Sequence, residues 1–193
     1  LGKRAAKEVQ EGMVVGLGTG STAYWAIEEL GARRAAGLNF TAVATSIASE
    51  EQAKGLNIKM LPMAGLTKVD ITIDGADEVS EDLDLIKGGG GALLREKLVA
   101  SISKRLIIIA DESKWVNRLG RFPLPIEVTQ FAWEVTALSL AKLGCHVRRR
   151  MVNDSAFVTD NGNYIMDCQF DKIEDPGRLN VALNLIPGVV ENG

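Results

Sequence analysis

Four charged residues in one stretch of the chain have the types and spacing that proton transfer on a small polar molecule requires. Asp74 follows the apolar run at 69–73, and Asp77 lies three residues further on in the same short turn. Two carboxylates held close together repel each other and bind protons unequally, which suits acid/base work. A magnesium ion is the alternative occupant of this pair, because hard cations prefer oxygen ligands.

The other two charged residues are Lys87 and Glu96. Lys87 precedes four glycines, Gly88–Gly91, which would let the loop approach a ligand closely while the lysine stabilises a developing oxyanion. Glu96 has apolar neighbours at helical spacing, so it is a usable general base if it faces the ligand. The alternative is a surface glutamate in the cluster Arg95-Glu96-Lys97. The nearby Glu78, Glu81, Asp82 and Asp84 are expected to form a solvated loop face.

A second glycine-rich loop, "GLGTGST" at 16–22, closes an apolar run and opens a helix. Helix N-termini bind anions, and Thr19, Ser21 and Thr22 add hydroxyl donors. The spacing G-x-G-x-G departs from the dinucleotide fingerprint G-x-G-x-x-G, and the lysine of a P-loop is absent. The loop therefore favours a single phosphate, with a dinucleotide site or a tight structural turn as alternatives.

Strands and helices alternate over residues 1–123, which we expect to form the first domain. This alternation predicts an α/β domain with a Rossmann-like, mostly parallel sheet and helices on both faces. The expected strands cover 13–17, 40–45, 58–61, 69–73 and 106–110, and the expected helices cover 3–10, 22–30, 49–54 and 92–103.

Residues 124–193 are expected to form a second, smaller domain. A strand at 126–129, a helix at 132–143, strands near 147–152, 156–159 and 164–167, a helix at 176–185 and a last strand near 189–190 predict a ferredoxin-like α+β unit. "TDNGN" at 159–163 is typical of a hairpin turn. We expect a C-terminal return to the first domain to lie beyond Gly193.

The composition excludes several functional classes. The chain has 193 residues, 46% of them hydrophobic, so it can bury a sizeable core, and its net charge of −3 offers no basic patch for nucleic acid. No apolar stretch reaches the ~20 residues of a membrane helix.

The only basic run, Arg148-Arg149-Arg150, is expected to be a solvated strand end. Cys145 and Cys168 lack metal-ligand spacing, and His146 is expected to be structural or exposed. A reducing cytoplasm is the simplest setting.

Seven motifs then occur in a fixed order along nearly the whole chain. Together they resemble the type A family of ribose-5-phosphate isomerases, with "DGADE" and "KGGGGALLREK" the most specific. The motifs are "GLGTGST", "DGADEV", "KGGGGALLREK", "DESK", "FPLPIEV", "VTDNGN" and "PGVVENG".

The resemblance implies an aldose–ketose isomerase of the pentose phosphate pathway that works without metal or cofactor. It would interconvert D-ribose 5-phosphate and D-ribulose 5-phosphate through an enediolate, as a homodimer or homotetramer. Glu96 would be the base, with Asp74, Asp77 and Lys87 at the reacting end. The positions that match substrate-binding residues are Thr19, Gly20, Ser21, Thr22, Gly75, Ala76, Gly88, Gly89, Gly90 and Lys114.

Two departures and three alternatives accompany this resemblance. Relatives carry a basic segment before Leu1 and a tail after Gly193, and both are expected to be trimmed or disordered here. A regulatory domain that binds a sugar phosphate would normally carry a DNA-binding helix-turn-helix segment. An amino-sugar phosphate deaminase or a lactonase would generally use a catalytic histidine. A nicotinamide-dependent oxidoreductase is the third alternative.

Overall fold

The computed structural model describes all residues from Leu1 to Gly193, and they form two compact units. The first unit contains residues 1–75 and 95–111, and the second contains residues 76–94 and 112–193. Each unit thus combines two segments of the chain. The expected division into domains 1–123 and 124–193 stays a prediction.

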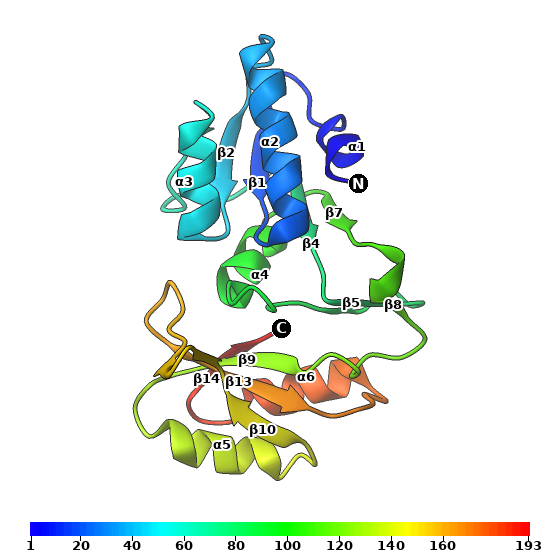
Figure 1. Ribbon diagram of the computed structural model, residues 1–193, viewed down its shortest axis with the longest axis vertical. Helices are drawn as coiled ribbons and strands as arrows, with labels where there is room; N and C mark the ends of the chain where they lie inside the picture. The colour runs from blue at the N-terminus through cyan, green and yellow to red at the C-terminus, as the bar shows by residue number, and fades with distance from the viewer. The chain divides into compact units, whose positions relative to one another are not determined.

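The first unit is built on a five-stranded sheet with the order β3-β2-β1-β4-β7 (Figure 1). Every neighbouring pair in this sheet is parallel. The strands are β1 (Val14–Leu17), β2 (Thr41–Ala44), β3 (Lys59–Met60), β4 (Ile71–Gly75) and β7 (Leu106–Ile109). The helices are α1 (Gly2–Ala6), α2 (Ser21–Ala35), α3 (Ile47–Gly55) and α4 (Leu93–Ser101), which belongs to this unit from Arg95 onward.

Side chains that alternate along these strands supply an apolar core on each face of the sheet. Val15 and Leu17 of β1 belong to a cluster that also contains buried residues of α1, α2 and α3. Val14 and Val43 belong to a separate cluster with Val99 of α4. Successive residues of a strand point to opposite faces, so helices cover both faces of the sheet. The predicted Rossmann-like arrangement is confirmed.

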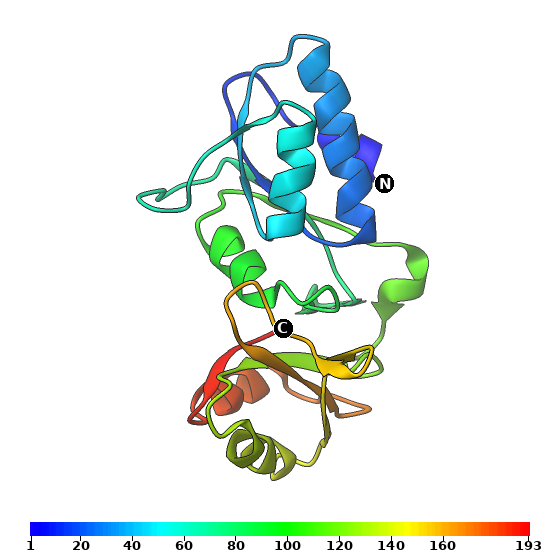
Figure 2. The same cartoon turned by 60° about the vertical axis from the view of Figure 1, so that its left-hand side comes forward.

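The second unit contains a four-stranded antiparallel sheet with the order β10-β13-β9-β14. Its core brings together Ile126, Met166, Leu140 of α5 and Leu183 of α6. Figures 1 and 2 both show α5 and α6 against one face of this sheet. The order of elements and strands confirms the predicted ferredoxin-like unit. Its elements are β9 (Leu124–Val128), α5 (Trp133–Ala141), β10 (His146–Arg149), β13 (Tyr164–Gln169), α6 (Pro176–Asn184) and β14 (Val189–Asn192).

The sequence did not predict a small three-stranded sheet of the second unit, which has the order β6-β5-β8. Two further short strands pair with each other outside it. The three-stranded sheet contains β5 (Glu78–Ser80), β6 (Leu85–Ile86) and β8 (Trp115–Val116), which follows the 3-10 turn η1 (Glu112–Lys114); the separate pair is β11 (Met151–Val152) and β12 (Ser155–Ala156).

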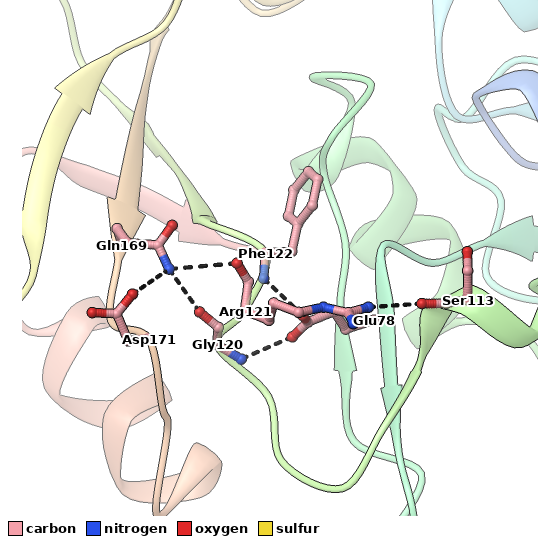
Figure 3. Close-up of polar contacts among 7 residues, drawn as sticks. All are labelled: Glu78, Ser113, Gly120, Arg121, Phe122, Gln169 and Asp171. Carbon is pink, nitrogen blue, oxygen red and sulfur yellow. Dashed lines mark hydrogen bonds and ion pairs between the residues drawn. The ribbon is translucent and has the colours of Figure 1, made fainter.

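Glu78 occupies the first position of β5, and the expectation that it would be solvated is wrong. Its side chain is only 1% exposed. The carboxylate accepts the backbone N–H of Gly120 at 2.8 Å and that of Phe122 at 2.7 Å, and Arg121 lies alongside it (Figure 3). Buried amides need acceptors, and this carboxylate supplies one for each. The neighbouring Glu81, Asp82 and Asp84 are exposed, as expected.

Two cysteines that are distant in the sequence meet in the core of the second unit. Both are buried free thiols. A hydrogen bond with Cys145, together with burial, raises the pKa of the Cys168 thiol. No cluster of three or more metal-binding side chains of the histidine, cysteine or acidic types occurs in the chain, and none of its helices has the length and apolar character of a membrane span.

Candidate active site

Asp74 and the first glycine loop lie together where β4 and β1 end. Asp74 is the fourth residue of β4 rather than the residue after it, and it is 1% exposed. Its Oδ1 accepts the backbone N–H of Thr19 at 3.1 Å and that of Gly75 at 2.8 Å. Ligands of open parallel sheets bind at these carboxyl ends. The structure therefore places Asp74 at the carboxyl ends of the parallel strands, where ligands of such sheets bind.

Gly18 makes the close approach of this loop to Asp74 possible. A Cβ atom at Gly18 would lie 2.2 Å from Oδ1 and 2.6 Å from Cα of Asp74. These distances are far inside van der Waals contact, and one of the opposing atoms is backbone. The strands β1 and β4 would have to shift before a side chain could fit.

We expect Gly18→Ala to lower the free energy of unfolding by about 1–3 kcal/mol, because overpacking forces the backbone to move. Urea denaturation followed by circular dichroism measures this loss. Gly55→Ala is the matched control, since its Cβ would meet nothing within 4 Å. If both variants were as stable as the parent protein, the close approach of Gly18 to Asp74 would be wrong.

The Thr19 hydroxyl was predicted to face substrate, but the structure places it in a cluster of hydroxyl groups. It lies 2.7 Å from Oγ1 of Thr45 and donates to Oγ of Ser46 at 2.8 Å. Ser46 also caps α3 by accepting the N–H of Ser49, whose hydroxyl donates to the Gly18 carbonyl at 2.7 Å. Thr45, Ser46 and Ser49 were not among the residues predicted to belong to the site. The pattern Ser46-x-x-Ser49 before a helix was the available signal.

The first glycine loop leads into the N-terminus of α2, where the sequence predicted an anion site. Gly20 is its N-cap residue, has φ 102°, and makes no side-chain capping bond. Gly20 and Ser21 are exposed, and Thr22 is half-buried. The first N–H groups of a helix have no partner within the helix, and they lie at the positive end of its dipole. In a helix of 15 residues this end suits a phosphate group.

The second unit holds Asp77 and the loop that follows Lys87. Asp77 accepts the N–H of Gly89 on Oδ2 at 2.7 Å, and its own N–H donates to the Ile86 carbonyl at 2.7 Å. A Cβ atom at Gly89 would lie 2.4 Å from Oδ1 of Asp77, so a side chain there would displace the Asp77 carboxylate. The N–H of Lys87 donates to the Gly193 carbonyl at 2.9 Å. The structure thus brings Asp77 and the glycine loop together.

The remaining predicted residues divide between the units. Glu96 lies on α4 in the first unit and is 5% exposed, so the alternative of a surface glutamate is wrong. Lys114 lies in the second unit, half-buried in η1, with Nζ 6.0 Å from the centre of the Phe122 ring. Gly75 and Ala76 are half-buried and Gly90 is exposed. The expected pairing of Asp74 with Asp77 stays a prediction.

These features define an α/β protein with a Rossmann-like sheet, a helix N-terminus suited to an anion, a buried Asp74 at the carboxyl end of a central strand and a buried Glu96 on a helix of the same unit. The family model described as ribose 5-phosphate isomerase A (phosphoriboisomerase A) matches residues 41–193. The chain belongs to this family.

Relatives and solved structures agree with this assignment. Ribose-5-phosphate isomerase A of Bacillus mycoides is 53% identical over 193 residues, which cover 100% of this chain and 87% of the relative. The structure of ribose 5-phosphate isomerase A from Methanocaldococcus jannaschii superimposes with a TM-score of 0.95 at 41% identity, covering 100% of this chain and 87% of that chain. A D-ribose-5-phosphate isomerase solved in complex with phospho-erythronic acid gives a TM-score of 0.94 at 38% identity, covering 100% of this chain and 86% of that chain.

Proposed function

We propose that this isomerase converts D-ribose 5-phosphate to D-ribulose 5-phosphate by a proton transfer that Glu96 carries out. The isomerisation is the reaction of the family to which the chain belongs. The observation that carries the assignment of the base is the burial of Glu96, at 5% exposure, within the motif "KGGGGALLREK". A buried carboxylate can be held in one orientation, and a general base must be positioned before it can act.

The proton moves between the two carbons at the reacting end. Glu96 removes the proton from C2 of the open-chain aldose, and the electron pair forms a C1–C2 double bond while the aldehyde oxygen gains negative charge. The carboxylic acid then returns the proton to C1, and the proton of the C2 hydroxyl passes to the C1 oxygen. The product is the ketose, and Glu96 is again a carboxylate.

Lys87 and the two aspartates have separate roles in this scheme. The Lys87 ammonium stabilises the negative charge on the enediolate oxygens, which is the largest charge that develops during the reaction. Asp74 and Asp77 assist ring opening and the transfer of hydroxyl protons. One related isomerase was solved with phospho-erythronic acid, whose planar carboxylate resembles the two oxygens of an enediolate.

The phosphate of the substrate is proposed to bind at the N-terminus of α2. Gly20, Ser21 and Thr22 offer backbone N–H groups there, and Ser21 and Thr22 add hydroxyls. Binding energy from this non-reacting group helps to orient the reacting carbons. Thr19 contributes through its loop position, because its hydroxyl is bonded to Thr45 and Ser46.

The reaction is tested by mixing the protein with ribose 5-phosphate and EDTA in heavy water and following the product by proton NMR. We expect ribulose 5-phosphate with deuterium at the carbon next to the carbonyl, since a proton held on a carboxylate exchanges with solvent. Product without deuterium would favour direct hydride transfer. Activity that EDTA abolishes and magnesium restores would contradict the proposal that no metal or cofactor takes part.

We expect Lys87→Ala to lower kcat while KM changes little. Removing one donor from a developing oxyanion typically costs about 10²–10³-fold in kcat. Initial rates over a range of ribose 5-phosphate concentrations separate the two constants, with Lys97→Ala, ten residues later in the sequence, as a control. A rise in KM at unchanged kcat would make Lys87 a binding group that acts equally before and during the reaction.

Oligomeric state and cellular setting complete the proposal. We infer a homodimer or homotetramer and a cytoplasmic enzyme, and the two buried free thiols suit a reducing compartment. Light scattering during gel filtration tests the first inference, since a monomeric mass would contradict it. Membership of an isomerase family argues against the three alternative functions. These are a regulatory domain that binds a sugar phosphate, an amino-sugar phosphate deaminase or lactonase, and a nicotinamide-dependent oxidoreductase.

A further inference from the structure

The arginine run Arg148-Arg149-Arg150 was expected to be a solvated strand end, and this is right for Arg148 alone. Arg148 is exposed. The Arg149 guanidinium lies 4.3 Å from the centre of the Trp133 ring and 5.2 Å from that of Tyr164. The Arg150 side chain is only 15% exposed, and it forms an ion pair with Asp167. Three consecutive arginines thus have three different environments, and only the last one touches the glycine loop.

Arg150 uses both sides of its guanidinium in the second unit. On one side it holds Asp167 through two bonds, Nε to Oδ2 at 3.0 Å and Nη2 to Oδ1 at 2.6 Å. On the other side Nη1 donates to the carbonyl oxygens of Gly88 and Gly89, each at 3.0 Å. The side chain therefore links strand β13 directly to the loop that follows Lys87.

We propose that Arg150 is a positioning residue for catalysis, which fixes the Gly88–Gly90 loop and strengthens the N–H donors of its peptides. This inference rests on the proposed function and deepens it. Arg150 makes no contact with substrate in this proposal. It acts through the two peptide groups whose carbonyls it binds.

The geometry of these peptides explains how the effect would pass to the reaction. A peptide whose carbonyl accepts a charged hydrogen bond becomes a stronger donor through its own N–H, because chains of hydrogen bonds polarise one another. The Gly88 carbonyl shares its peptide with the N–H of Gly89, which donates to Asp77 at 2.7 Å. The Gly89 carbonyl shares its peptide with the N–H of Gly90, which belongs to the loop proposed to meet the enediolate.

The loop also needs an external support of this kind. Gly88 has φ 94°, and Gly91 has φ 82° and donates its N–H to the Gly88 carbonyl at 2.9 Å. Glycine has more conformations to lose than any other residue, so four in a row do not fix a shape by themselves. Arg150 and Asp77 hold the loop from two directions. Arginine suits this position because its planar fork can bind Asp167 and two carbonyls at once, which a lysine cannot do.

The test compares steady-state kinetics of Arg150→Ala, Arg150→Lys and Arg148→Ala, the last as the exposed control in the same run. We expect Arg150→Ala to lower kcat about 10–100-fold, as small misplacements of a catalytic group do, with KM changed less than about three-fold. Arg150→Lys should stay impaired, and Arg148→Ala should match the parent protein. Millimolar guanidinium should restore part of the kcat of Arg150→Ala and none of that of Lys87→Ala.

The outcomes separate this inference from the proposed function. An inactive parent protein would overturn the function itself. An active parent protein whose folded Arg150→Ala or Arg150→Lys variant keeps kcat within two-fold would overturn the role of Arg150 alone. If Arg150→Ala does not fold, Arg150→Lys decides the question. If guanidinium does not restore the kcat of Arg150→Ala and the melting temperature of this variant is also lowered, Arg150 has only a structural role. That result would overturn the inference.

Discussion

The Glu96→Gln variant is expected to lose about 10²–10⁴-fold in kcat, the usual contribution of one positioned general base. The amide has almost the shape of the carboxylate, so it keeps the packing of a side chain that is only 5% exposed. It cannot accept the proton from C2 of the sugar. The binding of ribose 5-phosphate should therefore persist while turnover fails.

Two measurements check this expectation together. Coupled turnover assays give kcat, and isothermal titration with ribose 5-phosphate gives the dissociation constant of the slow variant. Glu81→Gln is the matched control, because it makes the same chemical change at an exposed position of the acidic segment. A Glu96→Gln variant with near-normal turnover would show that another group carries the proton. A variant that neither turns over nor binds would show that Glu96 holds the fold or the substrate.

Most of the fold could be predicted from the sequence because its strands and helices have strong periodic patterns. Strands β1, β2, β4 and β7 of the parallel sheet are short apolar runs with β-branched residues, and helical patterns follow β1 and β2 directly. The turn at 159–163 and the order of elements after Pro123 were enough to predict the ferredoxin-like unit. The structure has β1, β2, β4 and β7 within one or two residues of the expected bounds.

The three-stranded sheet could not be predicted in this way. Its strands β5, β6 and β8 have two or three residues each, which is too short for any periodic pattern. Strand β8 pairs with β5 across more than thirty residues of sequence, with Trp115 beside Val79. Such a pairing depends on the tertiary fold. The same limit explains the error at Glu78. Its position among other acidic residues does not indicate which backbone amides its carboxylate contacts in the folded protein.

The candidate site shows a similar division. The types and spacing of Asp74, Asp77, Lys87 and Glu96 made them candidates, with a magnesium site and a surface glutamate as alternatives, and their roles in the reaction stay predictions. The surroundings were not visible in the sequence. Thr19 was selected as a substrate-binding residue because of its hydroxyl group. In the structure this hydroxyl is hydrogen-bonded to Thr45 and Ser46. Arg150 was grouped with its solvated neighbour Arg148, although it contacts Asp167 and also Gly88 and Gly89, about sixty residues earlier in the chain.

Glu78→Ala is expected to cause the largest loss of stability among the substitutions considered. Figure 3 shows the carboxylate between the backbone amides of Gly120 and Phe122. Without it two amides in a buried setting lose their acceptor, and each unsatisfied group costs about 1–3 kcal/mol. The sum is about 2–6 kcal/mol, a large part of the ~5–15 kcal/mol that stabilises an ordinary domain. Glu78→Gln should lose less, because its carbonyl can still accept one of the two amides.

Hydrogen exchange distinguishes a local loss from a global one. The amides of Gly120 and Phe122 should exchange much faster in Glu78→Ala, and Glu81→Ala, an exposed neighbour, should change stability by no more than ~0.5 kcal/mol. If denaturation shows a loss below about 1 kcal/mol, water has replaced the carboxylate and the bonds to Gly120 and Phe122 contribute little. If the midpoint falls and exchange accelerates throughout residues 112–193, the small sheet is part of the cooperative structure of the second unit. Glu78 would then stabilise the unit that carries Asp77 and Lys87, which gives a structural reason for a buried acid within the motif "DGADEV".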